Sequence, residues 1–287
     1  MEKYYRFAGL ELCVATRDEW MYDDDRMLAP FRVESVTEPH RFIFTMVDVL
    51  TPPAGELTVT MDNFLEYREG DCQVRYIGTN EDWSRGYMRA EHRGREHTVE
   101  LKRSAYPGGV NAKAVLNAME AEHLIARNRG VVFHCSYIDR DGKAILFTAP
   151  SGTGKSTQAD LWHRYRNVQI INGDRAVIRL AEDQLVAEGI PFAGSSRYYQ
   201  NRSLPLKAIV YLGQAPKTTV RRLKGYEAFA CLWEGVSVNT WDKKDMELVS
   251  QVVEKTAQQI PVFYMPCTPD EEAVVALEQE LRKLENT

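Results

Sequence analysis

The chain has 287 residues, of which 44% are hydrophobic, 27% charged and 10% aromatic, so it can bury the core of one large domain or of two modest ones. Its formal net charge of −5 argues against a nucleic-acid partner, because affinity for a phosphate backbone comes from clustered lysine and arginine. The longest apolar runs have the length of a strand and the N-terminus has no apolar signal core, so we expect a cytoplasmic protein with no membrane partner.

The first 105 residues are predicted to form a β-rich N-terminal domain. Runs rich in Val, Ile, Thr, Tyr and Phe alternate with clusters of Pro, Gly, Asp and Asn, which predicts a meander of antiparallel strands. Such runs are residues 41–47, 56–61 and 72–77. The triplet Asp23-Asp24-Asp25 could be a metal site, but an isolated acidic run is more typical of a solvated loop. The segment 104–109 contains Pro and two Gly, so we expect a boundary there and domains at 1–105 and 106–287.

Helical and strand patterns alternate after this boundary. Helices are predicted at residues 111–128, 156–165 and 244–259, and from 268 onward, where Thr268-Pro269-Asp270-Glu271 is a capping box. Strands are predicted at 131–138, 144–148, 168–172, 176–180, 185–187 and 206–212. We find no internal repeat and no low-complexity segment.

The strands 131–138 and 144–148 are predicted to form a hairpin, because an Asp-Gly step lies between them. Its register has two alternatives. A two-residue turn at Asp141-Gly142 places His134 opposite Ala149, and a four-residue loop places it opposite Phe147. Both registers bring His134 to the mouth of the loop that follows the second strand.

That loop is the clearest motif in the chain. Residues 149–156 spell A-P-S-G-T-G-K-S, a phosphate-binding loop whose first glycine is alanine, between a predicted strand and a predicted helix. Backbone N–H groups and the helix dipole there favour polyphosphate, Lys155 would reach the terminal phosphates, and the Ser156 hydroxyl would bind Mg²⁺. The expected nucleotide contacts are Ser151, Gly152, Thr153, Gly154, Lys155, Ser156 and Thr157.

Two residues join Lys155 as candidates for catalysis. Phosphoryl transfer needs a carboxylate that holds the metal, and Asp174 follows the predicted strand 168–172; the alternative is an aspartate in a surface turn. His134 could orient a carboxylate or move a proton, or it is a strand histidine with a satisfied hydrogen bond. The arginines available to neutralise charge in the transition state are Arg175, Arg179, Arg197 and Arg202.

The five cysteines offer no comparable signal. They are odd in number and far apart, with no Cys-x-x-Cys pair, so we expect a reduced protein without a structural metal site. Cys135 follows His134 directly, but neighbouring strand residues point to opposite faces, which argues against a nucleophile pair.

The stretch 131–179 resembles the catalytic domain of HPr kinase/phosphorylase and, more distantly, ATP-dependent phosphoenolpyruvate carboxykinase. HPr kinases have a histidine at a fixed distance before the phosphate loop, and His134 and Ala149 have the same spacing. The core P-S-G-T-G-K-S at 150–156 matches both families.

A subgroup is more similar still. The segments 189–196 (G-I-P-F-A-G-S-S) and 205–210 (P-L-K-A-I-V) resemble the HPr-kinase-like proteins found beside peptide-modification genes, some of which phosphorylate lasso peptides. The resemblance covers roughly residues 111–287. It implies an α/β fold of the α+β type, in which a mixed, curved sheet carries the phosphate loop and helices flank it. It also implies Mg-ATP as the donor and a hydroxyl, often of serine, as the acceptor.

The chain departs from the family at one important place. HPr kinases have two consecutive aspartates after this strand, the first commonly assigned as the catalytic base. Matching Asp174-Arg175 to the family's Asp-Arg puts Gly173 at the base position. Shifting the alignment by one residue instead matches Gly173-Asp174-Arg175 to the Gly-Asp-Asp of the carboxykinases and puts Arg175 at the second aspartate. One carboxylate is missing either way.

The leading hypothesis from the sequence is an ATP-dependent kinase that acts on a hydroxyl of a peptide, protein or small molecule. The alternative is a nucleotide-binding accessory protein of a peptide-modification system with little or no turnover, of which Gly173 would be the sign. A true HPr kinase is disfavoured because no segment corresponds to the family's HPr-docking and phosphorolysis segment. The sequence leaves the oligomeric state open.

Overall fold

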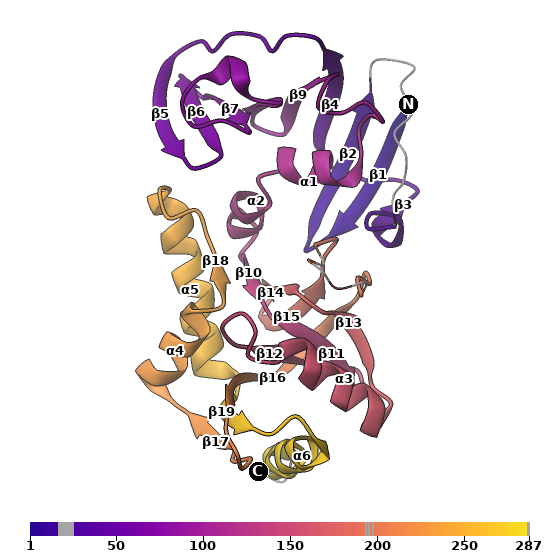
Figure 1. The fold of residues 1–287 in the computed structure, drawn as a ribbon, viewed down its shortest axis with the longest axis vertical. Coiled ribbons are helices and arrows are strands. Elements are labelled where there is room, and N and C mark those ends of the chain that lie inside the picture. The colour runs from indigo at the N-terminus through magenta and orange to yellow at the C-terminus, as the bar shows by residue number, and fades with distance from the viewer. Residues whose placement is uncertain (17–25, 193, 195, 197, 286–287) are drawn as a thin grey trace. The chain divides into compact units, whose positions relative to one another are not determined.

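A computed structural model describes residues 1–16, 26–192, 194, 196 and 198–285 (Figure 1). The acidic triplet at 23–25 lies outside the described residues. The chain divides into two compact units, Met1–Ala121 and Glu122–Thr287, whereas the sequence points to a boundary at 105/106.

The first unit is built on a nine-stranded sheet with the order β3-β1-β2-β4-β9-β8-β7-β6-β5. Its strands are β1 Glu2–Phe7, β2 Leu10–Thr16, β3 Arg32–Val33, β4 His40–Val47, β5 Glu56–Met61, β6 Phe64–Glu69, β7 Cys72–Ile77, β8 Met88–Arg93 and β9 Glu96–Lys102. Short 3-10 turns are η1 Ala29–Phe31 and η2 Trp83–Arg85. The predicted runs at 41–47, 56–61 and 72–77 are all strands.

The predicted antiparallel meander is correct for β5 to β9 and wrong for β4. Strand β4 pairs in parallel with both β2 and β9. Both pairings join strands that are far apart along the chain: residues 17–39 separate β2 from β4, and β5 to β8 separate β4 from β9. A crossover of a dozen or more residues permits parallel pairing, whereas a tight turn does not.

The predicted helix 111–128 is two helices in the structure, α1 Ala112–Ala118 and α2 Ala121–Arg127. The break lies at Glu120, whose backbone is left-handed with φ 48°. Its side chain is buried, with Oε1 2.9 Å from Arg75 Nε, and Gln73 donates to its other oxygen at 3.1 Å. Because these are contacts with a distant strand, helical periodicity does not reveal them.

Three histidines continue this buried polar network. His92 Nε2 lies 3.1 Å from Glu120 Oε1, His92 Nδ1 lies 2.9 Å from His97 Nδ1, and His97 Nε2 lies 3.0 Å from His40 Nδ1. The His97 ring is 2% exposed and stacks on Phe42. Burial, with the neighbouring His92 and His40, lowers the pKa of His97 to about 3. His97 is therefore neutral across the physiological range.

The second unit is built on a ten-stranded mixed sheet, in which β13-β11-β12-β16-β15-β14-β10-β18 form one path and β19 and β17 continue from β16. Its strands are β10 Gly130–His134, β11 Ser136–Arg140, β12 Lys143–Thr148, β13 Gln169–Asn172, β14 Arg175–Ala181, β15 Gln184–Gly189, β16 Ser203–Gln214, β17 Arg221–Leu223, β18 Val236–Ser237 and β19 Val262–Cys267. Its helices after α2 are α3 Lys155–Arg166, α4 Gly225–Trp233, α5 Lys243–Gln259 and α6 Glu271–Glu285.

Helices cover both faces of this sheet (Figure 1). Alternate residues of β12 face opposite sides, as a pleated strand requires: Ile145 and Phe147 join the core under α3 and α6, and Leu146 joins the core under α4 and α5. Strand β16 pairs in parallel with β12 on one side and β19 on the other. The carboxyl ends of these three strands therefore meet at one edge of the sheet.

The hairpin before the phosphate loop has the register expected for a two-residue turn. Ser136 pairs with Phe147 and Arg140 with Lys143, around Asp141-Gly142. The single strand expected at 131–138 is, however, two. Strand β10 leaves β11 at Cys135 and pairs with β14, where His134 lies opposite Arg175 instead of Ala149. The mixed sheet thus has a partner for β10 that the hairpin pattern does not predict.

Candidate functional site

The phosphate loop connects β12 to α3 with the expected geometry. Gly154 is the residue before the helix, and its φ of 112° is a backbone conformation that favours glycine. Its carbonyl accepts the first helical hydrogen bond, from Gln158 N at 2.9 Å. Ser156 and Thr157 are exposed in the first turn. The loop leaves the N–H groups of this turn without helical partners, which is the arrangement that binds phosphate oxygens.

Lys155 is held close to the loop. Its Nζ donates to the carbonyls of Ala149 at 2.9 Å and Pro150 at 3.4 Å, and its side chain is 8% exposed. Burial lowers the pKa of Lys155, and the charge of Asp174 opposes that shift. Lys155 is therefore held against the loop carbonyls, its charge interacts with that of Asp174, and phosphate oxygens could replace the carbonyls as its partners.

Asp174 follows β13 and is positioned by Asn172, which is fully buried. Asn172 Oδ1 accepts from the backbone N–H groups of Asp174 at 2.9 Å and Arg175 at 3.0 Å. Asn172 Nδ2 donates to the carbonyls of Ile190 at 3.0 Å and Phe192 at 2.9 Å. One amide thus fixes both the Asp174 turn and the segment that follows β15.

His134 reaches Asp174 from β10. Its Nε2 lies 3.4 Å from Asp174 Oδ1, and its carbonyl accepts from Thr148 Oγ1 at 2.9 Å, directly before the phosphate loop. Burial and then the charge of Lys155 lower the pKa of His134, against the opposing effect of Asp174. The imidazole is therefore neutral at pH 7 and can accept a proton.

Ser156 approaches the same turn from α3. Its Oγ lies within 3.4 Å of the Gly173 carbonyl, which also accepts from Ser136 Oγ at 3.2 Å. Ser156 provides a hydroxyl and Asp174 a carboxylate, and Mg²⁺ prefers such oxygen ligands. The residues present therefore fit a magnesium ion that accompanies a bound polyphosphate.

The four candidate arginines differ in their partners. Arg175 Nε lies 3.3 Å from Asp174 Oδ2, so this arginine belongs to the site. Arg179 forms a bidentate ion pair with Glu188, with N···O distances of 2.7 and 3.1 Å, and Arg202 pairs with Asp139 at 2.7 Å. The fourth, at position 197, lies outside the described residues.

Two glycines allow a close approach of the segment after β15. A Cβ at Gly173 would lie 2.2 Å from Ser196 Oγ, so Ser196 occupies the space that a side chain at 173 would need. A Cβ at Gly194 would lie 2.6 Å from Asp174 Cγ, and its φ is 53°. The glycines at 173 and 194 therefore leave room for Ser196 Oγ and for the Asp174 carboxylate.

A cavity of about 550 Å³ adjoins the phosphate loop on the side of β16 and β19. It is lined by Gly152, Thr153, Gly154, Thr157, Gln158, Gln214, Ala215, Cys267, Thr268 and Pro269. A larger cavity of about 750 Å³ lies between β17, α4 and α5, and no residue of the phosphate loop lines it.

Cys135 is not part of the site. It is fully buried, and burial raises the pKa of its thiol, so it is a packed thiol and not a nucleophile. All five cysteines are free.

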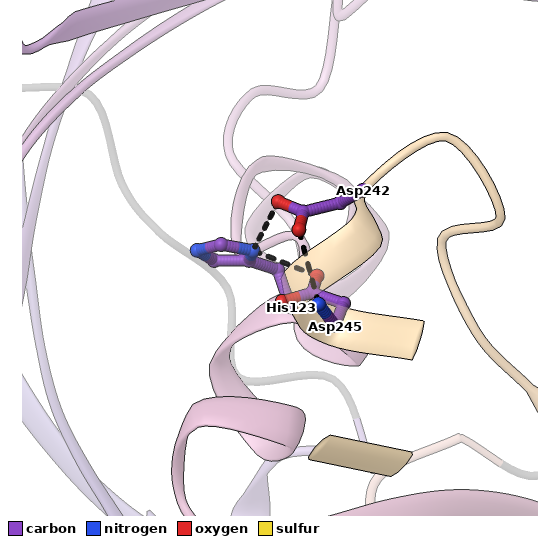
Figure 2. Close-up of side chains that lie close together, drawn as sticks. All are labelled: His123, Asp242 and Asp245. Carbon is purple, nitrogen blue, oxygen red and sulfur yellow. Dashed lines mark hydrogen bonds and ion pairs between the residues drawn. The ribbon is translucent and has the colours of Figure 1, made fainter. Parts of the chain in front are cut away.

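A second polar cluster joins α2 to the start of α5 (Figure 2). Asp245 is fully buried and accepts from His123 Nδ1 at 2.8 Å, Arg127 Nε at 3.0 Å and Asn239 Nδ2 at 3.3 Å. Asp242 caps α5 by accepting from Asp245 N at 3.0 Å. His123, Asp242 and Asp245 are close enough to hold a metal ion. Because N–H donors, one of them the Arg127 cation, already fill the Asp245 oxygens, we interpret the cluster as a structural clasp.

Comparisons with known proteins identify the family to which the chain belongs. The family profile of the SynChlorMet cassette protein ScmC matches residues 112–268, more than half of the chain, so the chain belongs to the ScmC family. No curated protein matches it. Among solved structures, the HPr(Ser) kinase/phosphatase from Coxiella burnetii matches with 13% identity and a TM-score of 0.33, over 54% of this chain and 93% of that one. No helix among the described residues is long and apolar enough to span a membrane.

Sequence reasoning missed three residues of the site. Asn172 and Gln158 are ordinary polar residues in a strand and a helix, and only their burial reveals them. Gly194 is one glycine in a loop, and its close approach to Asp174 appears only in three dimensions.

Proposed function

We propose that this protein is an ATP-dependent kinase that transfers the γ-phosphoryl group to a hydroxyl. The observation that carries the proposal is the convergence of three separate segments: the loop with Lys155, the turn with Asp174, and His134 within 3.4 Å of that carboxylate. Convergent cationic, carboxylate and proton-accepting groups beside a phosphate loop are what phosphoryl transfer requires.

The roles follow from the contacts. The loop N–H groups and Lys155 bind the β- and γ-phosphates, Ser156 and Asp174 hold Mg²⁺, and Arg175 neutralises added charge. Magnesium supplies positive charge to the phosphate oxygens. The acceptor oxygen bonds to the γ-phosphorus, the bond to the β–γ bridging oxygen breaks, and the acceptor proton passes to His134, whose neutral form is favoured by its lowered pKa.

The acceptor we propose is a serine of a peptide, in the cytoplasm where ATP is available. This rests on membership of a cassette-protein family and on the resemblance of segment 189–196 to HPr-kinase-like proteins that accompany peptide-modification genes. Protein and small-molecule hydroxyls are the other acceptors to test.

One observation favours a second candidate, a nucleotide-binding accessory protein with little turnover. Ser196 fills the space beside Gly173, so the site has one carboxylate where HPr kinases have two. In that case bound ATP would prepare a surface of the protein for a partner, without phosphoryl transfer.

Labelled ATP with Mg²⁺ and a panel of peptide, protein and small-molecule hydroxyls separates the two candidates. Wild type is compared with Lys155→Ala and Asp174→Asn, and nucleotide affinity is measured in parallel. Transfer or hydrolysis that both substitutions abolish supports the kinase. Binding of ATP with no turnover above that of Lys155→Ala would leave the accessory role, and absence of binding would remove both.

A further inference from the structure

The cavity beside the phosphate loop lies where three parallel strands end. Strands β12, β16 and β19 lead into the loop, into Gln214-Ala215 and into Cys267-Thr268 respectively. Ligands of open sheets bind outside the carboxyl ends of parallel strands. A molecule whose phosphates occupy the loop therefore has this cavity as the adjacent place for the rest of its structure.

The lining of the cavity is uncharged. No Lys, Arg, His, Asp or Glu is among the described residues that line it. Ala215, Pro269 and the polarizable Cys267 sulfur offer apolar contact, and Gln214 and Thr268 offer hydrogen-bonding groups. A mixed apolar and neutral polar lining suits a flat heterocycle rather than another phosphate. Its volume of about 550 Å³ lies in the range of small-molecule sites.

Gln158 provides the second, independent observation. It lines the cavity from α3, is 2% exposed, and donates from Nε2 to Cys267 Sγ at 3.2 Å. Its Oε1 is buried and has no hydrogen-bond partner in the described part of the chain. A buried acceptor without a donor costs on the order of 1–3 kcal/mol, so a ligand that supplies an N–H group is favoured there. The terminal torsion of glutamine is broad, so the amide can present Oε1 to the cavity without moving α3.

We infer that this cavity is the nucleobase subsite and that Gln158 selects adenine, with Oε1 accepting from the exocyclic 6-amino group. The inference rests on the proposed function as an ATP-dependent kinase and specifies the cavity and the residue that recognise the base. Guanine and hypoxanthine have a carbonyl at that position, which would face Oε1 as a second acceptor. A site that satisfies a buried polar group with a substrate N–H rejects the analogue without it.

The test compares three ligands by calorimetry: ATP, inosine triphosphate and inorganic tripolyphosphate. Wild type is expected to bind ATP at least about tenfold more tightly than inosine triphosphate, the ratio that one lost hydrogen bond produces. Gln158→Met keeps the side-chain length without the acceptor. In this variant the affinity for ATP should fall to the affinity for inosine triphosphate, and the affinity for tripolyphosphate should stay at the wild-type value. The matched control is Gln279→Met, on the exposed face of α6, which should keep the wild-type ratio.

Alkylation of Cys267 is a second readout that needs no variant. Cys267 lines the cavity and is half-buried, and Cys231, also half-buried, lies outside it. ATP should slow iodoacetamide modification of Cys267 but not of Cys231, and tripolyphosphate should protect neither.

The outcomes separate this inference from the proposed function. Equal affinity of wild type for ATP and inosine triphosphate, or unprotected Cys267 in saturating ATP, overturns the adenine subsite and leaves the kinase intact. Failure of wild type to bind either ATP or tripolyphosphate overturns both.

Discussion

At the scale of single residues, Asn172 and His134 decide whether Asp174 can work. Asn172 holds the turn through two accepted and two donated hydrogen bonds, and His134 provides the proton acceptor beside it. Both residues lie outside the phosphate-loop motif at 149–156. Their influence on transfer therefore tests the geometry and not the motif.

Asn172→Leu should disorganise the Asp174 turn. It leaves two N–H groups and two carbonyls without their partner, so we expect a loss of unfolding free energy of at least about 2 kcal/mol, measured by urea denaturation. Transfer should fall in parallel while Lys155-dependent nucleotide binding persists. Asn172→Asp keeps the acceptor and loses the donor, so it should lie between wild type and Asn172→Leu. Equal stability of all three proteins would contradict this role.

His134→Gln should lower kcat by about 10²–10⁴-fold, the usual contribution of a positioned acid or base. Burial and the charge of Lys155 lower the pKa of His134 from its usual value of 6.5. We therefore expect wild-type kcat to stay constant as the pH falls to 6.5 and to decrease only at lower pH. The variant should lack that acidic limb. His163→Gln, on the exposed side of α3, is the control and should retain the wild-type profile. A limb that survives in His134→Gln would assign the proton to another group.

At the scale of elements, the clasp fixes α2 against the start of α5 and so holds the strand β10 that follows α2. His123 lies in the predicted helix 111–128, Asp245 lies in the predicted helix 244–259, and Asp242 lies just before that second helix. Only folding brings Asp245 Oδ2 to 2.8 Å from His123 Nδ1.

Asp245→Asn should cost about 1–3 kcal/mol of unfolding free energy, because it leaves buried donors facing an uncharged amide. Arg127→Ala should cost less, about 1 kcal/mol or under, since this guanidinium is partly exposed to solvent. If the cluster is a clasp, neither EDTA nor Zn²⁺ changes the Tm of wild type. A Zn²⁺-dependent rise in Tm that His123→Ala abolishes would instead establish a metal site.

At the scale of the whole molecule, each unit has its own buried core. Leu65, Val74 and Tyr76 belong to the core of the first unit, and the two clusters on either face of the second sheet belong to the other. Units with separate cores can unfold separately. His97, whose pKa is lowered to about 3, lies in the first unit, and the phosphate loop lies in the second.

We therefore expect two calorimetric transitions with different sensitivities. ATP should raise the transition temperature of the second unit only, because ligand binding stabilises the unit that holds the site. Acid should lower the transition temperature of the first unit. The pKa of His97 is about 3 in the folded state and near 6.5 in the unfolded state, so the unfolded state takes up a proton first as the pH falls. This contribution is complete above pH 6.5 and declines as the pH falls toward 3.

The contribution of His97 is limited by one proton, about 1.4 kcal/mol per pH unit. His97→Phe, which keeps the ring stacked on Phe42, should reduce the difference in stability of the first unit between pH 7.5 and pH 5. A single transition that moves with both ATP and pH would contradict the independence of the units.

Local chemistry explains what the sequence could predict. The phosphate loop was predictable because glycine at 154, the strand before it and the helix after it are all set by neighbouring residues. The strands 56–61 and 206–212 and the turn at Asp141-Gly142 were predictable for the same reason, since side-chain alternation and left-handed glycine act over a few residues.

The sequence by itself determined the strand, the glycine-rich loop and the helix at residues 144–165, and it named His134 and Asp174 as a candidate pair. Tertiary structure alone decided that β10 pairs with β14, that Glu120 breaks a helix, that Asn172 fixes Asp174 and that Ser196 fills the space at Gly173. These depend on contacts between segments distant in the chain. Burial and partner geometry arise only when the chain folds, and neither periodicity nor motif spacing encodes them.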